Sequence, residues 1–297
     1  MTASLTWGSL WAARLVIIPR FNTKPVLKAI TKYKATAFVG VPSIYIALDK
    51  MIRENPQKYS IESLKLTGVG MAPCPQDMIE LFKKNYNKEL LEGYGLTENS
   101  GVTFQNIPER GSKIGSVGCP FPDTEVKIVN LETDQEVGIN EPGELCLKGP
   151  HITKGYWKKE SETNNVLKDG WLYTGDIAKI DEEGFFYILG RKDDVIGVKG
   201  YQVYPQEIEN VLQATGLISE SAVVGISDKY AGQKILAYII PKNDKEIDPD
   251  ILKKHCEKNL AAFKVPSDFV IKDDFPRSPV RKILKYKLRE EAIEKNK

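Results

Sequence analysis

Residues 89–98 read ELLEGYGLTE, and within this stretch the pattern changes from that of a strand to that of a turn. The run from Glu89 to Leu91 predicts a short strand, and the two glycines that follow predict a sharp turn. Upstream, amphipathic helical stretches alternate with short apolar runs, which predicts α/β layering. The expected helices cover residues 24–33, 42–52 and 75–86, and the expected strands cover residues 36–41, 64–69 and 89–91.

After residue 111 the chain breaks into short strand-like runs separated by glycine, proline and aspartate. These runs predict a small β-rich subdomain, with the letters DEEG at 181–184 as a hairpin turn. Beyond residue 190 helical and strand-like patterns mix again, which predicts a compact α+β unit. We therefore expect a partial α/β lobe over 1–111, a β-rich subdomain over 112–190 and a small carboxy-terminal α+β domain over 191–297.

The composition is that of an ordinary globular protein and excludes several classes. Its 42 basic and 40 acidic residues give a net charge of +2, so the overall charge favours neither nucleic acid nor an anionic membrane. No stretch approaches the roughly 20 apolar residues that a membrane span requires. The four cysteines form no C-x-x-C pair, which argues against a zinc site. Because the start lacks a basic region and a cleavage site, we expect a cytoplasmic protein.

The stretch from Glu92 to Glu98 contains the residue types that a nucleotide phosphate requires. Glycines let the backbone approach a ligand closely, and the Tyr94 ring can stack on a base. The Thr97 hydroxyl can donate to a phosphate, and the Glu98 carboxylate can hold Mg²⁺. An ordinary glycine-rich turn explains the same letters, so this pattern alone leaves both interpretations open.

Other positions offer complementary chemistry. Asp176 could accept both hydroxyls of a ribose, and Arg191 after the returning strand could complete the clamp. Taken alone, these two residues are more simply a surface ion pair or turn residues, although a single predicted hairpin joins them. Lys282 could neutralise charge on an α-phosphate, whereas the plainer interpretation of its basic run is a solvated helix face. Only two histidines and no G-x-S-x-G motif occur, so neither histidine-based catalysis nor an α/β-hydrolase is expected.

Taken in this order, the motifs resemble the adenylate-forming superfamily of acyl-CoA synthetases, luciferases and peptide-synthetase adenylation domains. The resemblance covers nearly the whole chain and is most similar to fatty-acyl and aryl CoA ligases in the segment GVKGYQVYP at 197–205. It implies an α/β remnant of the large adenylation domain with its β-subdomain, followed by a mobile carboxy-terminal domain. The segments that carry it are GMAP at 70–73, YGLTE at 94–98, GEL at 143–145 with GYW at 155–157, YTGD at 173–176, 190–209 and 276–285.

The resemblance also implies roles for individual residues. Catalysis would rest on Lys282, which promotes adenylate formation, on Thr97 at the α-phosphate, and on Glu98, which would hold Mg²⁺. Asp194 would be the hinge of the small domain. The nucleotide and CoA would be bound by a larger set, comprising Gly70, Met71, Ala72, Pro73, Gly93, Tyr94, Gly95, Leu96, Thr97, Asp176, Arg191, Lys199, Gly200 and Gln202.

The implied activity is that of an AMP-forming acid–thiol ligase, which uses ATP, Mg²⁺ and CoA to activate a small carboxylic acid, expected to be a fatty acid. Arg281 stands where the family usually has glycine, and the Pro-Lys-Gly loop that grips the β- and γ-phosphates is not found. We therefore expect an amino-terminally truncated chain, a fragment or one subunit whose missing half a separate chain could supply. The alternatives are a non-catalytic nucleotide- or acyl-adenylate-binding module and an inactive gene remnant.

Overall fold

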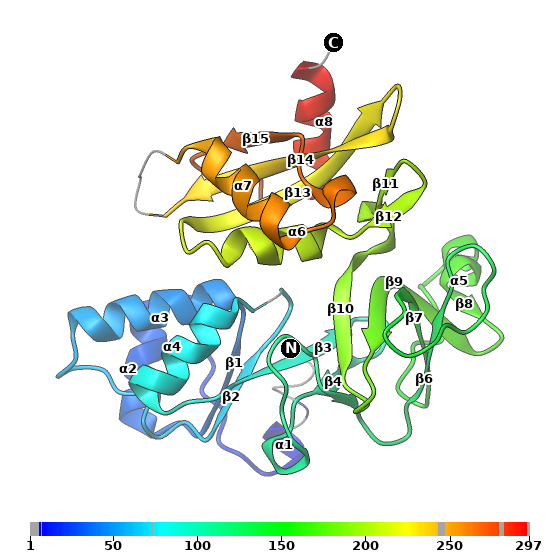
Figure 1. Cartoon of the computed structure of the whole chain (residues 1–297). Helices are drawn as coiled ribbons and strands as arrows, with labels where there is room; N and C mark the ends of the chain where they lie inside the picture. Colours follow the sequence, from blue (N-terminus) through cyan, green and yellow to red (C-terminus); the bar gives the residue numbers. More distant parts are fainter. Residues whose placement is uncertain (1–5, 7, 73, 243–246, 279–281, 296–297) are drawn as a thin grey trace. The chain divides into compact units, whose positions relative to one another are not determined.

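The computed structural model describes residues 6, 8–72, 74–242, 247–278 and 282–295 (Figure 1). They divide into two compact units, the first of residues Met1–Thr174 and Lys179–Ile188, the second of residues Gly175–Ala178 and Leu189–Lys297. The described strands form three five-stranded sheets. The fold class expected from the sequence is confirmed, since mixed α/β and β-rich parts precede a small α+β part. The expected boundaries at residues 111 and 190 stay predictions.

The first sheet has the order β1-β2-β3-β4-β5 and joins a parallel half to an antiparallel half. Helices α2, α3 and α4 lie alongside its parallel strands (Figure 1). The strands are β1 (Ala37–Gly40), β2 (Leu66–Val69), β3 (Leu90–Leu96), β4 (Gly101–Gln105) and β5 (Cys119–Pro120), and the helices are α1 (Gly8–Leu10), α2 (Thr23–Tyr33), α3 (Pro42–Glu54) and α4 (Gln76–Tyr86).

Local sequence explains where these helices begin and end. The Asn22 side chain caps α2 by accepting the Lys24 N–H at 3.1 Å, and Pro42 starts α3, where its missing N–H costs nothing. Asn87 ends α4 in the left-handed conformation. The apolar faces of the three helices meet the sheet in one core, in which Tyr45 is 1% exposed.

The glycine-rich turn expected from residue 92 onward is wrong in part, because β3 continues through Leu96. The Gly-Tyr-Gly letters have little strand propensity of their own. Antiparallel pairing with β4 holds them extended, with Tyr94 opposite Phe104 and Leu96 opposite Gly101. The turn itself is confined to residues 97–100.

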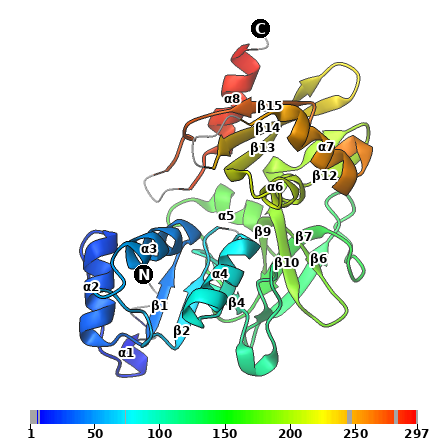
Figure 2. The same cartoon turned by 60° about the vertical axis from the view of Figure 1, so that its left-hand side comes forward.

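The second sheet has the order β10-β9-β7-β6, with β8 pairing on β9. Thr174 is buried and its hydroxyl donates to the Leu145 carbonyl at 2.8 Å, which ties β9 to β7. Figure 2 shows these strands standing next to the short helix α5. The elements are β6 (Glu125–Val129), β7 (Gly143–Lys148), α5 (Glu160–Val166), β8 (Leu167–Lys168), β9 (Trp171–Ile180) and β10 (Phe186–Arg191).

The third sheet, β12-β11-β14-β13 with β15 beside β14, forms the centre of the second unit. Helices α6 and α7 pack on one face of the sheet and α8 on the other, so the sheet separates two apolar cores (Figure 1). The elements are β11 (Ile196–Val198), β12 (Tyr201–Val203), α6 (Pro205–Gln213), β13 (Ile218–Asp228), β14 (Gly232–Pro241), α7 (Pro249–Asn259), β15 (Asp268–Ile271) and α8 (Lys285–Lys295).

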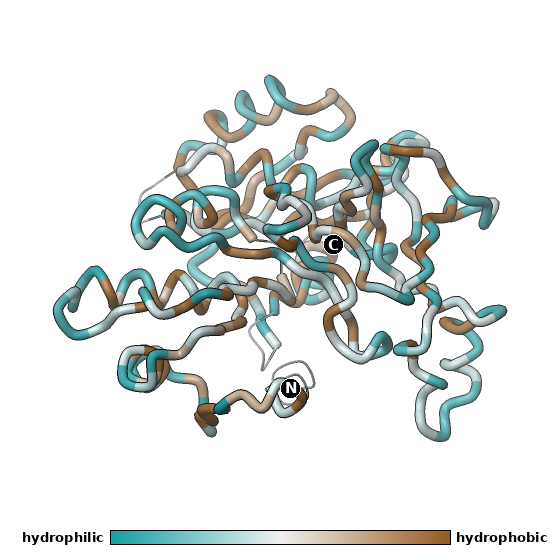
Figure 3. Tube along the Cα trace, turned by 90° about the horizontal axis from the view of Figure 1, so that it is seen from below, coloured by the Kyte–Doolittle hydropathy of each residue, from teal (hydrophilic) through white to brown (hydrophobic). Residues whose placement is uncertain are grey.

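Hydrophobic residues are distributed along the trace in short stretches (Figure 3). Among the described residues, no helix combines the length and the apolar character that crossing a bilayer would require.

Candidate functional site

Two of the segments expected to bind a nucleotide lie side by side in the first unit. Val69 at the end of β2 pairs with Glu92 in the parallel strand β3, so the loop that starts at Gly70 emerges beside Gly93. A methyl group on Gly70 would come within 3.0 Å of the Gly93 carbonyl oxygen, which is tighter than ordinary contact. Only a glycine at position 70 allows this approach without a shift of the backbone.

The loop after β2 is exposed and turns sharply. Met71 has a φ of 65° and is 76% exposed, and Ala72 is exposed as well. A left-handed methionine is uncommon and marks a position held by its surroundings. Pro73, expected in the same pocket wall, lies outside the described residues.

We call residues 92–98 the glycine-tyrosine segment. Tyr94 is half-buried and packs edge-on against Phe104, with ring centroids 5.8 Å apart. Gly95 is so close to β4 that an added methyl group would overlap the Gly101 carbonyl. Leu96 is half-buried, and its N–H donates to the Asn99 side chain at 2.8 Å, closing the turn that follows.

Glu92, for which no role was predicted from the motifs, accepts more hydrogen bonds than the other carboxylate of this segment, Glu98. One of its oxygens accepts the Gly115 N–H at 2.9 Å, and the carboxylate also accepts the Cys74 N–H. Burial raises the pKa of Glu92 to about 7, and these two N–H bonds only partly oppose that rise. Glu92 therefore fastens the loops on both sides of the glycine-tyrosine segment.

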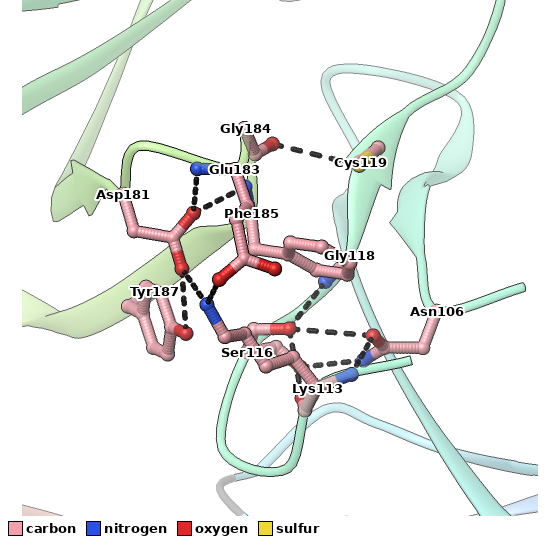
Figure 4. Close-up of polar contacts among 10 residues, drawn as sticks. All are labelled: Asn106, Lys113, Ser116, Gly118, Cys119, Asp181, Glu183, Gly184, Phe185 and Tyr187. Carbon is pink, nitrogen blue, oxygen red and sulfur yellow. Dashed lines mark hydrogen bonds and ion pairs between the residues drawn. The ribbon is translucent and has the colours of Figure 1, made fainter. Parts of the chain in front are cut away.

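The loop that carries Gly115 is itself tied to the hairpin between β9 and β10 (Figure 4). The Lys113 ammonium lies 2.6 Å from Asp181 and 2.7 Å from Glu183. Burial alone would raise the pKa of Asp181, but Lys113, two backbone N–H groups and the Tyr187 hydroxyl lower it to about 2. At neutral pH the Asp181 carboxylate is therefore ionised and keeps its ion pair with Lys113.

The same loop is braced internally, as the right-hand side of Figure 4 shows. The Asn106 side-chain oxygen accepts the Lys113 N–H at 3.0 Å, and its amide group donates to the Ser116 carbonyl at 2.7 Å. The Ser116 hydroxyl in turn donates to the Lys113 carbonyl at 2.8 Å. Gly115 is thus presented to Glu92 by a loop with defined geometry.

Thr97 and Glu98 lie in the turn after β3. Thr97 is exposed, whereas the half-buried Glu98 accepts the Tyr156 hydroxyl at 2.7 Å and its carbonyl accepts the Thr153 N–H at 2.7 Å. Among the described residues there is no cluster of three or more metal-binding side chains. One oriented carboxylate fits Mg²⁺, which proteins often hold through one or two carboxylates together with substrate phosphates. A serine or threonine hydroxyl nearby would suit the same cation.

Asp176 and Arg191 meet in the second unit. The Arg191 Nη1 lies 3.0 Å from the Asp176 Oδ1, and Asp176 is 5% exposed. The ion pair of the plainer interpretation is therefore observed, with an exposed arginine, but its carboxylate is buried and does not lie at the surface. Gly175 has a φ of 68°, and a methyl group there would come within 3.0 Å of the guanidinium. The YTGD glycine therefore makes room for the arginine.

Lys199, Gly200 and Gln202, which belong to the set expected to bind the nucleotide and CoA, lie in a tight hairpin between β11 and β12. Lys199 and Gly200 have φ values of 51° and 84°, as a two-residue turn between antiparallel strands requires. Gln202 accepts the Tyr204 hydroxyl at 3.1 Å. Asp194, the expected hinge, lies 3.1 Å from Arg289 of α8.

Lys282 is exposed and precedes α8, so it does not lie on a helix face as the plainer interpretation of the basic run supposed. Its N–H donates to the Ser278 hydroxyl at 3.1 Å, and its carbonyl accepts the Ser278 N–H at 2.9 Å. Arg281 lies outside the described residues. The structure thus groups Gly70–Ala72 with the glycine-tyrosine segment in the first unit, and Asp176 with Arg191 in the second.

Two family comparisons divide the chain in the same order as these sites. The AMP-binding enzyme family matches residues 1–157, and the AMP-binding enzyme C-terminal domain matches residues 207–282. The first match includes the loop after β2, the glycine-tyrosine segment and Tyr156. The second ends at Lys282.

Individual relatives agree with these matches. A long-chain-fatty-acid–CoA ligase of Bacillus subtilis is 39% identical over 99% of this chain and 52% of its own length, and one of Yersinia pestis is 38% identical over 94% and 49%. The chain thus spans about half the length of these curated relatives.

Solved structures share the fold. ATP-bound MatB from Rhodopseudomonas palustris superposes with a TM-score of 0.91 at 29% identity, covering 100% of this chain and 59% of that one. The o-succinylbenzoate CoA synthetase of Bacillus subtilis, in complex with its acyl-adenylate intermediate, gives a TM-score of 0.85 at 30% identity, covering 97% and 57%.

Proposed function

The chain belongs to the AMP-binding enzyme family, and from that premise we propose that it takes part in the ATP-dependent ligation of a fatty acid to CoA. The substrate class follows the curated relatives, which are named long-chain-fatty-acid–CoA ligases. The solved structures in complex with ATP or an acyl-adenylate support the order of the two half-reactions.

One observation carries the proposal. The loop from Gly70 to Ala72 leaves the carboxyl end of β2, and the glycine-tyrosine segment continues the parallel strand β3 beyond that end into the turn at residues 97–100. In open α/β sheets, ligands bind outside the carboxyl ends of the strands. Three features lie at that edge. The Tyr94 ring suits an adenine, the exposed backbone suits the phosphates, and the Glu98 carboxylate suits a cation.

In the first half-reaction, an oxygen of the fatty-acid carboxylate attacks the α-phosphorus of ATP. The bond to pyrophosphate breaks, pyrophosphate leaves with its electron pair, and acyl-AMP remains. Tyr94 would stack on the adenine, Asp176 with Arg191 would hold the ribose, and Thr97 would donate to the α-phosphate. The Lys282 ammonium would offset the negative charge that gathers as the two anions react.

In the second half-reaction, the CoA thiolate attacks the acyl carbon, and AMP leaves with the electrons of the broken C–O bond. The first step needs a cation beside the α-phosphate, whereas the second step needs an open path at the same position through which the thiol can enter. We propose that the small carboxy-terminal domain, the part of the chain that follows Asp194, pivots at this residue, so that Lys199, Gly200 and Gln202 take over from Lys282.

Glu98, oriented by Tyr156, would hold Mg²⁺ together with the phosphates. When bound, the cation would supply positive charge to the phosphate oxygens. We assign Tyr156 the task of fixing the carboxylate before the cation arrives.

The test begins with binding. Calorimetric titration of the chain with AMP and with a non-hydrolysable acyl-adenylate mimic should show binding that Tyr94→Ala and Asp176→Asn each weaken by about 10-fold. Fatty-acid-dependent ATP–pyrophosphate exchange is then measured with the chain alone and with a second chain that supplies the expected amino-terminal half.

The outcomes separate the alternatives. Exchange that requires a fatty acid supports the ligase. AMP binding without exchange in either mixture would favour a non-catalytic nucleotide-binding module. Failure to bind AMP or the mimic would leave only an inactive remnant.

A further inference from the structure

Arg277 joins the segment before Lys282 to the central sheet of the second unit. Its Nη2 lies 2.8 Å from the Glu220 carboxylate on β13, and its Nε lies 3.2 Å from Asp274. The Arg277 side chain is 18% exposed, whereas its partners Glu220 and Asp274 are 42% and 75% exposed. A planar guanidinium can bond two carboxylates at fixed angles, which an ammonium cannot do.

The backbone of Arg277 extends this anchor to the neighbour of Lys282. Arg277 forms an isolated antiparallel bridge with Ile283, and the Leu284 N–H donates to the Pro276 carbonyl at 2.8 Å. Ile283 packs against the apolar core that includes Phe275 and Leu288. Both legs of the hairpin are therefore attached to the same body.

Ser278 forms two hydrogen bonds with the backbone of Lys282. The Ser278 hydroxyl accepts the Lys282 N–H, and the Ser278 N–H donates to the Lys282 carbonyl. The lysine backbone is thus held on both of its polar groups, while its side chain is exposed. An exposed ammonium on a four-carbon stem can act at a fixed place only if its Cα is fixed.

We propose that Arg277 is a positioning residue for adenylate formation, which holds the Lys282 hairpin (residues 276–278 and 282–284) in register with β13 through Glu220. This inference rests on the proposed function, because it assigns Lys282 to the first half-reaction. Arg277 itself touches no substrate. Its contribution is to keep the Lys282 backbone where the ammonium meets the reacting phosphate.

The test compares Arg277→Met, which keeps length but loses the charge and the fork, with Arg277→Lys, which keeps the charge alone. Lys272→Met is the matched control. It breaks another ion pair of the same unit, Lys272 with Glu291 at 2.6 Å, and the Lys272 side chain is 22% exposed, close to that of Arg277.

Two readouts are taken on each variant. Hydrogen exchange of peptides that cover residues 276–284 should become about 10-fold faster or more in Arg277→Met, with β13 and β14 unchanged. Adenylate formation should fall by about 10- to 100-fold in kcat, as expected when a reacting group is misplaced by about 1 Å. The KM for ATP and acyl transfer from supplied acyl-AMP to CoA should stay within about two-fold. Arg277→Lys should be intermediate, and Lys272→Met should match the wild type.

Unchanged exchange in the hairpin would overturn the proposal, as would equal losses in the two half-reactions, which indicate general destabilisation. A wild-type chain without adenylate formation under every condition would refute the proposed function instead. The hydrogen-exchange comparison needs no activity, so it still decides whether Arg277 anchors Lys282.

Discussion

The glycine-tyrosine segment and the Lys282 hairpin are built by different physics. In the first, the backbones of β3 and β4 approach so closely at Gly95 that no side chain fits, and the half-buried carboxylate of Glu92 accepts N–H groups from two loops. In the second, an exposed lysine depends on ion pairs whose carboxylates are 42% and 75% exposed. Close backbone packing is insensitive to ionic strength but is disrupted by any added side-chain volume. Exposed ion pairs accept added volume, but salt screens their attraction. The glycine-tyrosine segment is therefore held by backbone packing, whereas the Lys282 hairpin is held by partly exposed ion pairs.

The largest effect that this comparison predicts is that of Gly95→Ala. An added methyl group would overlap the Gly101 carbonyl, so β3 and β4 must separate. We expect the free energy of unfolding to fall by about 3 kcal/mol or more, with loss of nucleotide binding. Denaturant titration and AMP calorimetry measure both.

Gly197→Ala in β11 is the control for Gly95→Ala, because its nearest new contact would be 3.8 Å away. Its free energy of unfolding should stay within about 0.5 kcal/mol of the wild type. Equal tolerance of alanine at positions 95 and 197 would contradict the contrast between the two regions.

Lys282→Ala comes next. Removing the ammonium should lower adenylate formation by about 100-fold or more, while acyl transfer from supplied acyl-AMP to CoA is spared. Lys287→Ala, which removes another exposed lysine nearby, should change neither rate. Loss of both half-reactions in Lys282→Ala would show that the lysine serves more than the first step.

Glu92→Gln should alter the pH dependence of stability. The native carboxyl binds its proton more tightly than the unfolded one, because its pKa is raised from 4.5 to about 7. Between these values the unfolded state holds fewer protons, so wild-type stability falls as pH rises through that window. Glutamine does not titrate, so we expect the wild type to lose about 3 kcal/mol relative to the variant between pH 4.5 and 8.

Unfolding midpoints at pH 4.5, 6, 7 and 8 measure this difference for the two proteins. Glu89→Gln, at an exposed carboxylate just before β3, should track the wild type. Parallel pH profiles for wild type and Glu92→Gln would show that folding does not raise the pKa of Glu92.

The smallest effect is expected from Tyr156→Phe, which removes the hydroxyl that lies 2.7 Å from Glu98. The concentration of Mg²⁺ for half-maximal adenylate formation should rise by about 10-fold, since groups that orient a metal ligand commonly change affinity to this extent. Tyr187→Phe removes a similar hydroxyl from Asp181, at 3.0 Å, and should leave the Mg²⁺ dependence unchanged. An unchanged value in Tyr156→Phe would remove the tyrosine from the site.

Sequence patterns were sufficient for the parts of the fold that local rules determine. The helix expected over residues 24–33 is observed as Thr23–Tyr33, because its apolar face and its asparagine cap are local signals. The extension of β3 through Gly93 and Gly95 was missed, since pairing with β4 overrides their low strand propensity.

The candidate site divides in the same way. Motif letters were enough to single out the glycine-tyrosine segment, Asp176, Arg191 and Lys282. The motifs did not predict the roles of Glu92 and Arg277, because a charged residue beside glycine or proline in a sequence does not indicate whether its side chain is buried. The partners of these residues are also distant, with Gly115 23 positions from Glu92 and Glu220 57 positions from Arg277. Tyr156 stands within the GYW motif, so its role could have been sought there.

The pair between Asp194 and Arg289 has a practical consequence. If residue 194 is the pivot that we propose, it cannot rotate freely, because its side chain is paired with Arg289 and α8 must either follow the rotation or release its arginine. A fluorescent label near the carboxyl end of α8 would therefore report turning at residue 194 without any probe near the chemistry.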